Sequence, residues 1–328
     1  MNSRAIVSAA GLRALLVPLA LGLGACTEYE ITSTVGADGA GTRIEVVRVT
    51  PGEADTAVSP ADYVHLLGLD ASRGWRHRTE GDDDTTHVWE RERTLVAAGD
   101  WSDLSGSVVL RGTTPAHAAD RIGRLRLGDV SFANEVDLLL VRSPSGDTLA
   151  WQESFAWTNG AGALVEHFTE VLGAAIARVH PRLSAEPRAE IAGLIRAGFW
   201  AAFEEGLLTP ESGTDDDALI EAFVVRTARL AADAIRETDP AVDAVRLAEI
   251  LRRELDDDEA LETFLETTLP GLNLAGAVGI ELRLVLPGRV LDSNAGDVRG
   301  DTLVWEVDPS EALVTPVRTW ATAVVGGG

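Results

Sequence analysis

The stretch from His77 to His87 is the nearest thing to a metal site in the sequence. This stretch encloses Glu80 and three consecutive aspartates at residues 82–84. Imidazole nitrogens and carboxylate oxygens are ligands for divalent cations. A calcium loop, however, spaces its oxygen ligands along the chain, whereas a run of adjacent like charges is typical of a solvated loop tip. We therefore predict no metal site here.

A second titratable group, Glu166, His167 and Glu170, falls on one side of a predicted helix, where a carboxylate and an imidazole could exchange protons. A solvated surface stripe is the commoner explanation of this spacing. The chain also lacks a Gly-x-Ser-x-Gly elbow, a phosphate loop, a dinucleotide fingerprint and a His-Glu-x-x-His zinc helix. We predict a protein that is not an enzyme and takes no cofactor, with an envelope hydrolase as the remaining catalytic alternative.

The single cysteine, Cys26, follows a segment with the features of an export signal. A short region with Arg4 and Arg13 leads into an apolar run at residues 14–23, which ends in small residues. This run is shorter than the ~20 apolar residues that a transmembrane helix needs. The pattern predicts a secretory signal peptide at residues 1–25.

The end of this segment, Leu23-Gly24-Ala25-Cys26, resembles the lipobox of bacterial lipoproteins. The resemblance implies cleavage between Ala25 and Cys26, a diacylglycerol on the Cys26 sulfur and a fatty acid such as palmitate on the new amino terminus. Two or three acyl chains hold a protein at a membrane for practical purposes permanently. We therefore predict a lipid-anchored protein of the cell envelope. Because Thr27 rather than aspartate follows the cysteine, the sorting habit of some two-membrane bacteria predicts the outer membrane.

The charge of the chain excludes nucleic acid as a partner. The net charge is −24, every one of the 28 basic residues is arginine, and removal of the signal makes the net charge −26. Phosphate binding needs a basic surface, which this composition lacks. The 302 residues after Cys26 suffice for one large or two ordinary domains. With its only cysteine lipidated, the mature chain has no intramolecular disulfide.

The first part of the mature chain has the patterns of β strands. Asp38-Gly39 lies between two apolar, β-branched runs and predicts a hairpin, and Ser143-Pro144-Ser145-Gly146 predicts the turn of a second one. We expect strands at residues 29–35, 44–49, 87–95, 108–110, 131–142 and 149–157.

One face of the last of these strands carries large rings. Trp151, Phe155 and Trp157 alternate with smaller or polar residues, and Trp305 comes from a strand expected to face them. If the β domain encloses a hydrophobic ligand, these four residues line it, because large rings offer apolar area and a defined shape. The alternative is that they fill a closed core, which is the commoner role at this spacing.

From residue 161 the apolar period changes from two to 3.6, which predicts helices. We expect them at residues 161–179, 186–208, 216–237, 240–255 and 256–269. Together they form a helical block long enough to have its own core.

Strand character returns at residues 279–286, 302–307 and 317–325. The connection between the first two contains Pro287-Gly288-Arg289-Val290, then Ser293-Asn294-Ala295-Gly296, then Gly300-Asp301-Thr302-Leu303-Val304-Trp305. These motifs, with the Asp-Gly turn soon after the lipid cysteine, resemble LppM-type envelope lipoproteins. The resemblance implies a β domain that binds or carries a lipid or another hydrophobic molecule. The helical block departs from the family pattern.

The predicted fold is therefore α+β, with a mainly antiparallel β domain at residues 26–160 and 273–325 and a helical insertion at residues 161–272. The predicted function is that of a membrane-anchored envelope lipoprotein, whose partners are the membrane, through Cys26, and a hydrophobic molecule. The alternative is a scaffold that uses the helical block as a docking surface for another protein.

Overall fold

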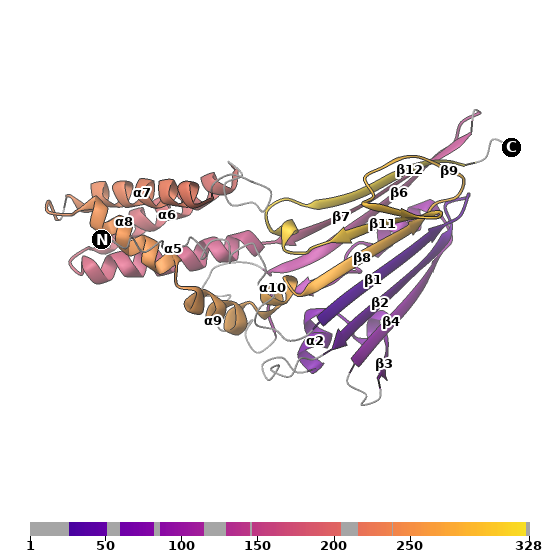
Figure 1. Cartoon of the computed structure of the whole chain (residues 1–328), viewed down its shortest axis with the longest axis horizontal. Coiled ribbons are helices and arrows are strands. Elements are labelled where there is room, and N and C mark those ends of the chain that lie inside the picture. Colours follow the sequence, from indigo (N-terminus) through magenta and orange to yellow (C-terminus); the bar gives the residue numbers. More distant parts are fainter. Residues whose placement is uncertain are drawn as a thin grey trace, which may run out of the picture. The chain divides into compact units, whose positions relative to one another are not determined.

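The computed structural model describes residues 26–50, 60–81, 86–114, 129–144, 146–204, 216–237 and 239–325. They form two compact units, a helical unit within residues 161–265 and a β unit from the described residues before 161 and after 265 (Figure 1). The predicted α+β class, with mostly antiparallel sheets, is confirmed. The predicted signal peptide lies outside the described residues.

The β unit contains two sheets that face each other across one core. The larger sheet holds, in spatial order, β10 (Asp297–Arg299), β11 (Thr302–Val307), β8 (Val278–Val285), β1 (Cys26–Val35), β2 (Gly41–Thr50), β4 (Thr86–Leu95) and β3 (Arg76–Glu80). The smaller sheet holds β5 (Val109–Arg111), β6 (Ser131–Val141), β7 (Asp147–Thr158), β12 (Val317–Val325) and β9 (Arg289–Ser293). Neighbouring strands are antiparallel except β1 and β8.

Both predicted hairpins are present, as β1–β2 and β6–β7. Gly39 in the first turn has φ 83°, a conformation that favours glycine, which agrees with the Asp-Gly signal. The strands that the sequence did not predict are β3, β9 and β10. They carry mostly exposed side chains, so no buried alternation marks them.

Short helices complete the β unit. They are α2 (Pro60–Leu66), α10 (Pro270–Ala275) and the 3₁₀ segments η2 (Ala71–Arg73), η3 (Ala98–Leu104) and η5 (Glu311–Leu313). The sequence predicted that the helical insertion ends at residue 272, which would place part of α10 in the insertion. In the structure α10 packs on β5, where the Gly271 amide donates to the Gly112 carbonyl at 3.1 Å. A Cβ at Gly271 would lie 1.6 Å from the Arg111 carbonyl oxygen, so only glycine permits this approach.

The helical unit begins with α5, which leaves the β unit directly after β7. Its helices are α5 (Gly160–Val179), α6 (Ala185–Glu204), α7 (Asp216–Ile235), α8 (Ala244–Leu255) and α9 (Asp258–Thr268). Phe199 lies at the centre of their core, with its ring centroid 5.4 Å from that of Phe168 and 4.6 Å from that of Phe223. The helical period of the apolar residues, which predicted this block, follows from burial of one face of each helix.

One predicted helix start was wrong. The sequence placed the start of α8 at Pro240, but the helix begins at Ala244. Asp243 is the N-cap, and its carboxylate accepts a hydrogen bond from the Val245 amide at 2.9 Å. Residues 239–242 form a turn in which the Val242 amide donates to the Asp239 carbonyl. Asp243 therefore fixes the start of the helix, and Pro240 belongs to the turn before it.

Candidate functional site

The predicted lipid attachment site stands at the start of the β unit. Cys26 is the first residue of β1 and pairs with Thr50 of β2, while Thr27 pairs with Val278, the first residue of β8. The predicted lipid attachment residue is thus part of the larger sheet, while Ala25 lies outside the described residues. No helix among the described residues is long and apolar enough to cross a membrane. A lipid on Cys26 would join the sheet without an intervening linker.

Both connections between the β unit and the helices lie at this same end of the sheets. A tight turn joins the end of β8 to β9. Both β9 and β7 pair with β12, and Val325, the last residue of β12, pairs with Asp147, the first residue of β7. Asp147 therefore lies at the end away from Cys26, and β7 runs toward the Cys26 end, where Thr158 precedes α5. β8, which follows the helices, also begins at the Cys26 end.

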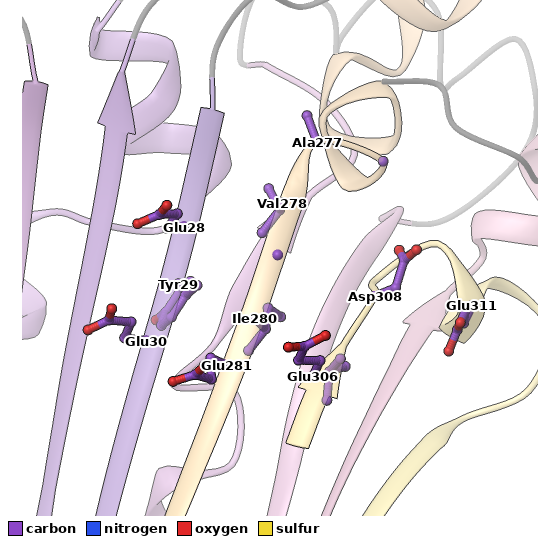
Figure 2. Close-up of a pocket in the computed structure, with 13 residues that line it drawn as sticks. Glu28, Tyr29, Glu30, Ala277, Val278, Ile280, Glu281, Glu306, Asp308 and Glu311 are labelled. Carbon is purple, nitrogen blue, oxygen red and sulfur yellow. The ribbon is translucent and has the colours of Figure 1, made fainter. Parts of the chain in front are cut away.

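An acidic groove of about 650 Å³ crosses the outer face of the larger sheet close to this end (Figure 2). Its carboxylates come from β1, β8, β11 and the segment after β11, namely Glu28, Glu30, Glu281, Glu306, Asp308 and Glu311. Glu30 pairs with Arg48 at 3.1 Å, and Glu281 pairs with Arg283 and Arg299. Among the described residues, no group of three metal-ligating side chains is placed to hold an ion. The groove is a partly neutralised, solvated acidic face.

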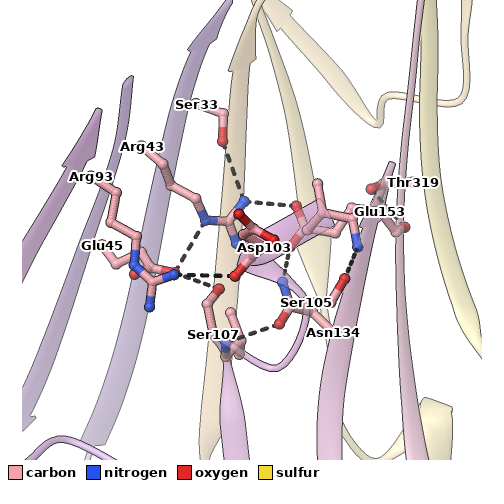
Figure 3. A network of polar contacts seen from close by, with 12 residues as sticks. Ser33, Arg43, Glu45, Arg93, Asp103, Ser105, Ser107, Asn134, Glu153 and Thr319 are labelled. Carbon is pink, nitrogen blue, oxygen red and sulfur yellow. Dashed lines mark hydrogen bonds and ion pairs between the residues drawn. The ribbon is translucent and has the colours of Figure 1, made fainter. Parts of the chain in front are cut away.

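A network of charged and polar side chains lies buried between the two sheets (Figure 3). Its members, here called the central network, are Ser33, Arg43, Glu45, Arg91, Ser107, Asn134 and Glu153. The Arg43 guanidinium on β2 donates two hydrogen bonds to Glu153 on β7, at 3.0 and 2.8 Å, and so joins the sheets. Both side chains are fully buried.

Each carboxylate of the central network is neutralised by arginine. Glu153 also accepts a 2.6 Å bond from the Asn134 amide. Glu45 accepts bonds from Arg43 at 3.1 Å, from Arg91 at 2.6 Å and from the Ser107 hydroxyl at 2.9 Å. With two arginines and two glutamates, the network carries no net charge, which is the condition under which buried ions are tolerated.

The electrostatics of the central network keep its ions charged. Burial alone would raise the pKa of Glu45, but Arg43 and Arg91 outweigh it and hold that pKa below its ordinary value. Burial alone would lower the pKa of Arg43, but the carboxylates of Glu153 and Glu45 hold it above its ordinary value. Burial is the largest cause that raises the pKa of the nearby Tyr29 hydroxyl, and the Glu45 carboxylate raises this pKa further. These groups are buried between the sheets, and the Arg43–Glu153 pair joins them.

Comparison with known proteins shows no family for the chain. No protein-family model and no curated protein sequence matches it. Among solved structures, the chain is similar to the folded domain of LppM from Mycobacterium tuberculosis, an NMR structure, with a TM-score of 0.31 and 10% sequence identity over 93% of each chain. A likeness at this level says nothing about the chemistry of a site.

The four aromatic residues predicted to line a ligand all lie in the core of the β unit. Trp151 and Phe155 are buried on the inner face of β7 on either side of Glu153, and Trp157 and Trp305 are at most 8% exposed. The Trp151 ring meets that of Trp101 edge to face, with centroids 5.1 Å apart. Glu153 lies in the middle of this face and is paired with Arg43. The ligand-lining role of the four residues stays a prediction.

The indole groups of Trp151 and Trp157 allow a matched test of core packing. Trp157 Nε1 donates to the Pro309 carbonyl at 2.8 Å, whereas Trp151 Nε1 has no partner among the described residues. We expect Trp157→Phe to lower the free energy of unfolding by about 1–2 kcal/mol more than Trp151→Phe, because only the first leaves a buried carbonyl unpaired. Urea denaturation of the two variants measures the difference. Equal losses would contradict this assignment.

The histidines singled out in the sequence lie in two places. His77 on β3 and His87 on β4 share a hydrogen bond, with Nε2 and Nδ1 3.1 Å apart, while residues 82–84 lie outside the described residues. Burial lowers the pKa of His77, and His87 lowers it further. His167 stacks on Phe264 with centroids 3.7 Å apart, and burial lowers its pKa to about 4. His167 is therefore neutral at pH 7.

Proposed function

We propose that the protein is an envelope lipoprotein held at a membrane by acyl chains on Cys26. The observation that carries the proposal is the lipobox-like Leu23-Gly24-Ala25-Cys26 after an apolar run, together with the place of Cys26 in the larger sheet, where it pairs with Thr50. A direct join of this kind keeps the Cys26 end of the sheets close to the bilayer surface. Thr27, after the cysteine, supports sorting to the outer membrane in a cell with two membranes.

We further propose a binding role rather than catalysis. The central network is buried and neutral, which favours a structural role for its ion pairs. The proposed ligand is a lipid or another hydrophobic molecule, and its proposed lining is the aromatic face of Trp151, Phe155, Trp157 and Trp305.

A scaffold role is the second candidate, and exposed apolar side chains on the helices favour it. Trp200 on α6 is 39% exposed and Val245 on α8 is 69% exposed, with Val225 and Leu230 on α7 also exposed. Large apolar side chains in contact with water are typical of surfaces that meet another protein when they form a patch. A protein anchored at the envelope could use such helices to hold a partner at the membrane.

Mass spectrometry of protein purified from its own envelope tests the anchor. We expect a mature chain that begins at Cys26 and carries the mass of a diacylglyceryl group and one further acyl chain. The same protein should stay in the membrane fraction through high-salt washes and leave it in detergent, because the anchor is hydrophobic. A chain that retains residues 1–25, or an unmodified Cys26, would refute the lipoprotein proposal.

A further inference from the structure

A groove of about 480 Å³ lies between α5 and α6 in the helical unit. Its surface combines small residues with buried aliphatic walls, namely Gly173, Ala174, Ala177, Ala192, Ile176, Leu183 and Ile191. Small residues normally let two helices approach closely. Here the surfaces of α5 and α6 that face each other leave a space. Packing within the helical unit therefore does not account for the small residues.

Gly173 makes this point most clearly. It lies in the interior of α5, where glycine weakens a helix relative to alanine. A Cβ at Gly173 would meet no atom within 4 Å, so close packing inside the unit does not require glycine there. Because Gly173 has no side chain, the groove is deeper at its position.

An unpartnered polar group also faces the groove. Thr169 lines it and is only 4% exposed, and its Oγ1 has no hydrogen-bond partner among the described residues. Buried hydroxyl groups are almost always hydrogen-bonded. The Thr169 hydroxyl can both donate and accept, so it is a ready contact for a polar group of an occupant.

The charges on the groove define the occupant further. Arg196 binds Glu166 with two hydrogen bonds, at 2.5 and 2.9 Å, and so closes one end. Glu170 and Arg188 also line the groove, and neither makes an ion pair within the described residues. Because α5 and α6 run antiparallel from the Glu166–Arg196 pair, Arg188 lies about one helical turn, ~6 Å, farther along the groove than Glu170.

We propose that this groove binds an amphipathic helix of a partner protein. The lining runs from Glu166 to Ala177 on α5, about 16 Å, which suits an elongated segment with apolar side chains on successive turns. The partner helix carries a basic residue that meets Glu170 and an acidic residue, one turn away, that meets Arg188. This deepens and rests on the scaffold role proposed above.

Fluorescence anisotropy with the purified full chain tests the proposal. The probes are three labelled amphipathic peptides with leucines at positions i, i+3, i+4 and i+7, which differ only in two charged residues one turn apart. These are Lys and Glu, two Lys, or two Glu. We expect the Lys/Glu peptide to bind about tenfold more tightly than either of the others, because only it complements both free charges of the groove. Glu170→Arg should shift the preference to the Glu/Glu peptide, and Arg188→Glu to the Lys/Lys peptide.

A filled groove supplies the control. Gly173→Met should abolish binding of the Lys/Glu peptide, whereas Gly193→Met should not, because Gly193 lies on α6 outside the lining and a Cβ there also meets no atom within 4 Å. Circular dichroism checks that both variants fold. The proposal would be overturned if the Lys/Glu peptide did not bind, if the three peptides bound equally, or if Gly173→Met left binding unchanged. Displacement of the peptide by a lysophospholipid would also overturn it. None of these results bears on the lipid at Cys26, which membrane fractionation tests separately.

Discussion

Glu153→Ala is expected to lower the free energy of unfolding of the β unit by about 3–5 kcal/mol. The substitution leaves the Arg43 guanidinium fully buried and without the two hydrogen bonds that join it to β7. It also removes the acceptor of the Asn134 amide. Leaving one ion unpaired in the interior destabilises the fold by more than the intact pair stabilises it. The reason is that the buried ion has lost its contacts with water and no longer has a partner in their place.

Chemical denaturation of the purified chain measures this loss. Glu135→Ala is the matched control, because Glu135 is exposed on the neighbouring strand β6, and its replacement should change stability by at most about 0.5 kcal/mol. The double variant Arg43→Leu, Glu153→Leu should recover part of the loss, because it removes both ions together. A loss below about 1 kcal/mol in Glu153→Ala would show that water reaches the central network.

Cys26→Ser is expected to abolish lipid anchoring completely. Serine has no sulfur to accept a diacylglycerol, so the chain should remain an uncleaved precursor or leave the membrane fraction. Cell fractionation followed by immunoblotting measures the change. Glu28→Gln is the control, because Glu28 is exposed on the same strand two residues away and should leave anchoring intact.

Thiol labelling adds an independent measure of the same step. Cys26 is the only cysteine, so the wild-type protein should contain no free thiol once it is lipidated, while an unprocessed wild-type precursor should contain one. If the Cys26→Ser protein still runs at the mature size and stays with the membrane, the lipobox interpretation fails.

The sequence by itself determined most of the local structure. The alternation around Asp38-Gly39 and around residues 143–146 predicted both hairpins, and the 3.6-residue period after residue 160 predicted α5 to α9, because each element buries one face. It also contained a signal for the central network. Arg43 and Glu45 stand in phase with the buried Val47 and Val49 of β2, and Glu153 stands in phase with Trp151. Charged residues on an apolar face mark a buried ion pair once the strand is assigned.

Only the tertiary structure decided which of these residues meet. Arg43 and Glu153 are 110 residues apart, and their contact depends on how the two sheets face each other, which no local pattern encodes. The α5–α6 groove depends in the same way on the spacing between helices, since small residues at helical period fit a tight contact as well as an open one. Local periodicity records which face of an element is buried, whereas the partner on that face is set by the packing of the whole unit.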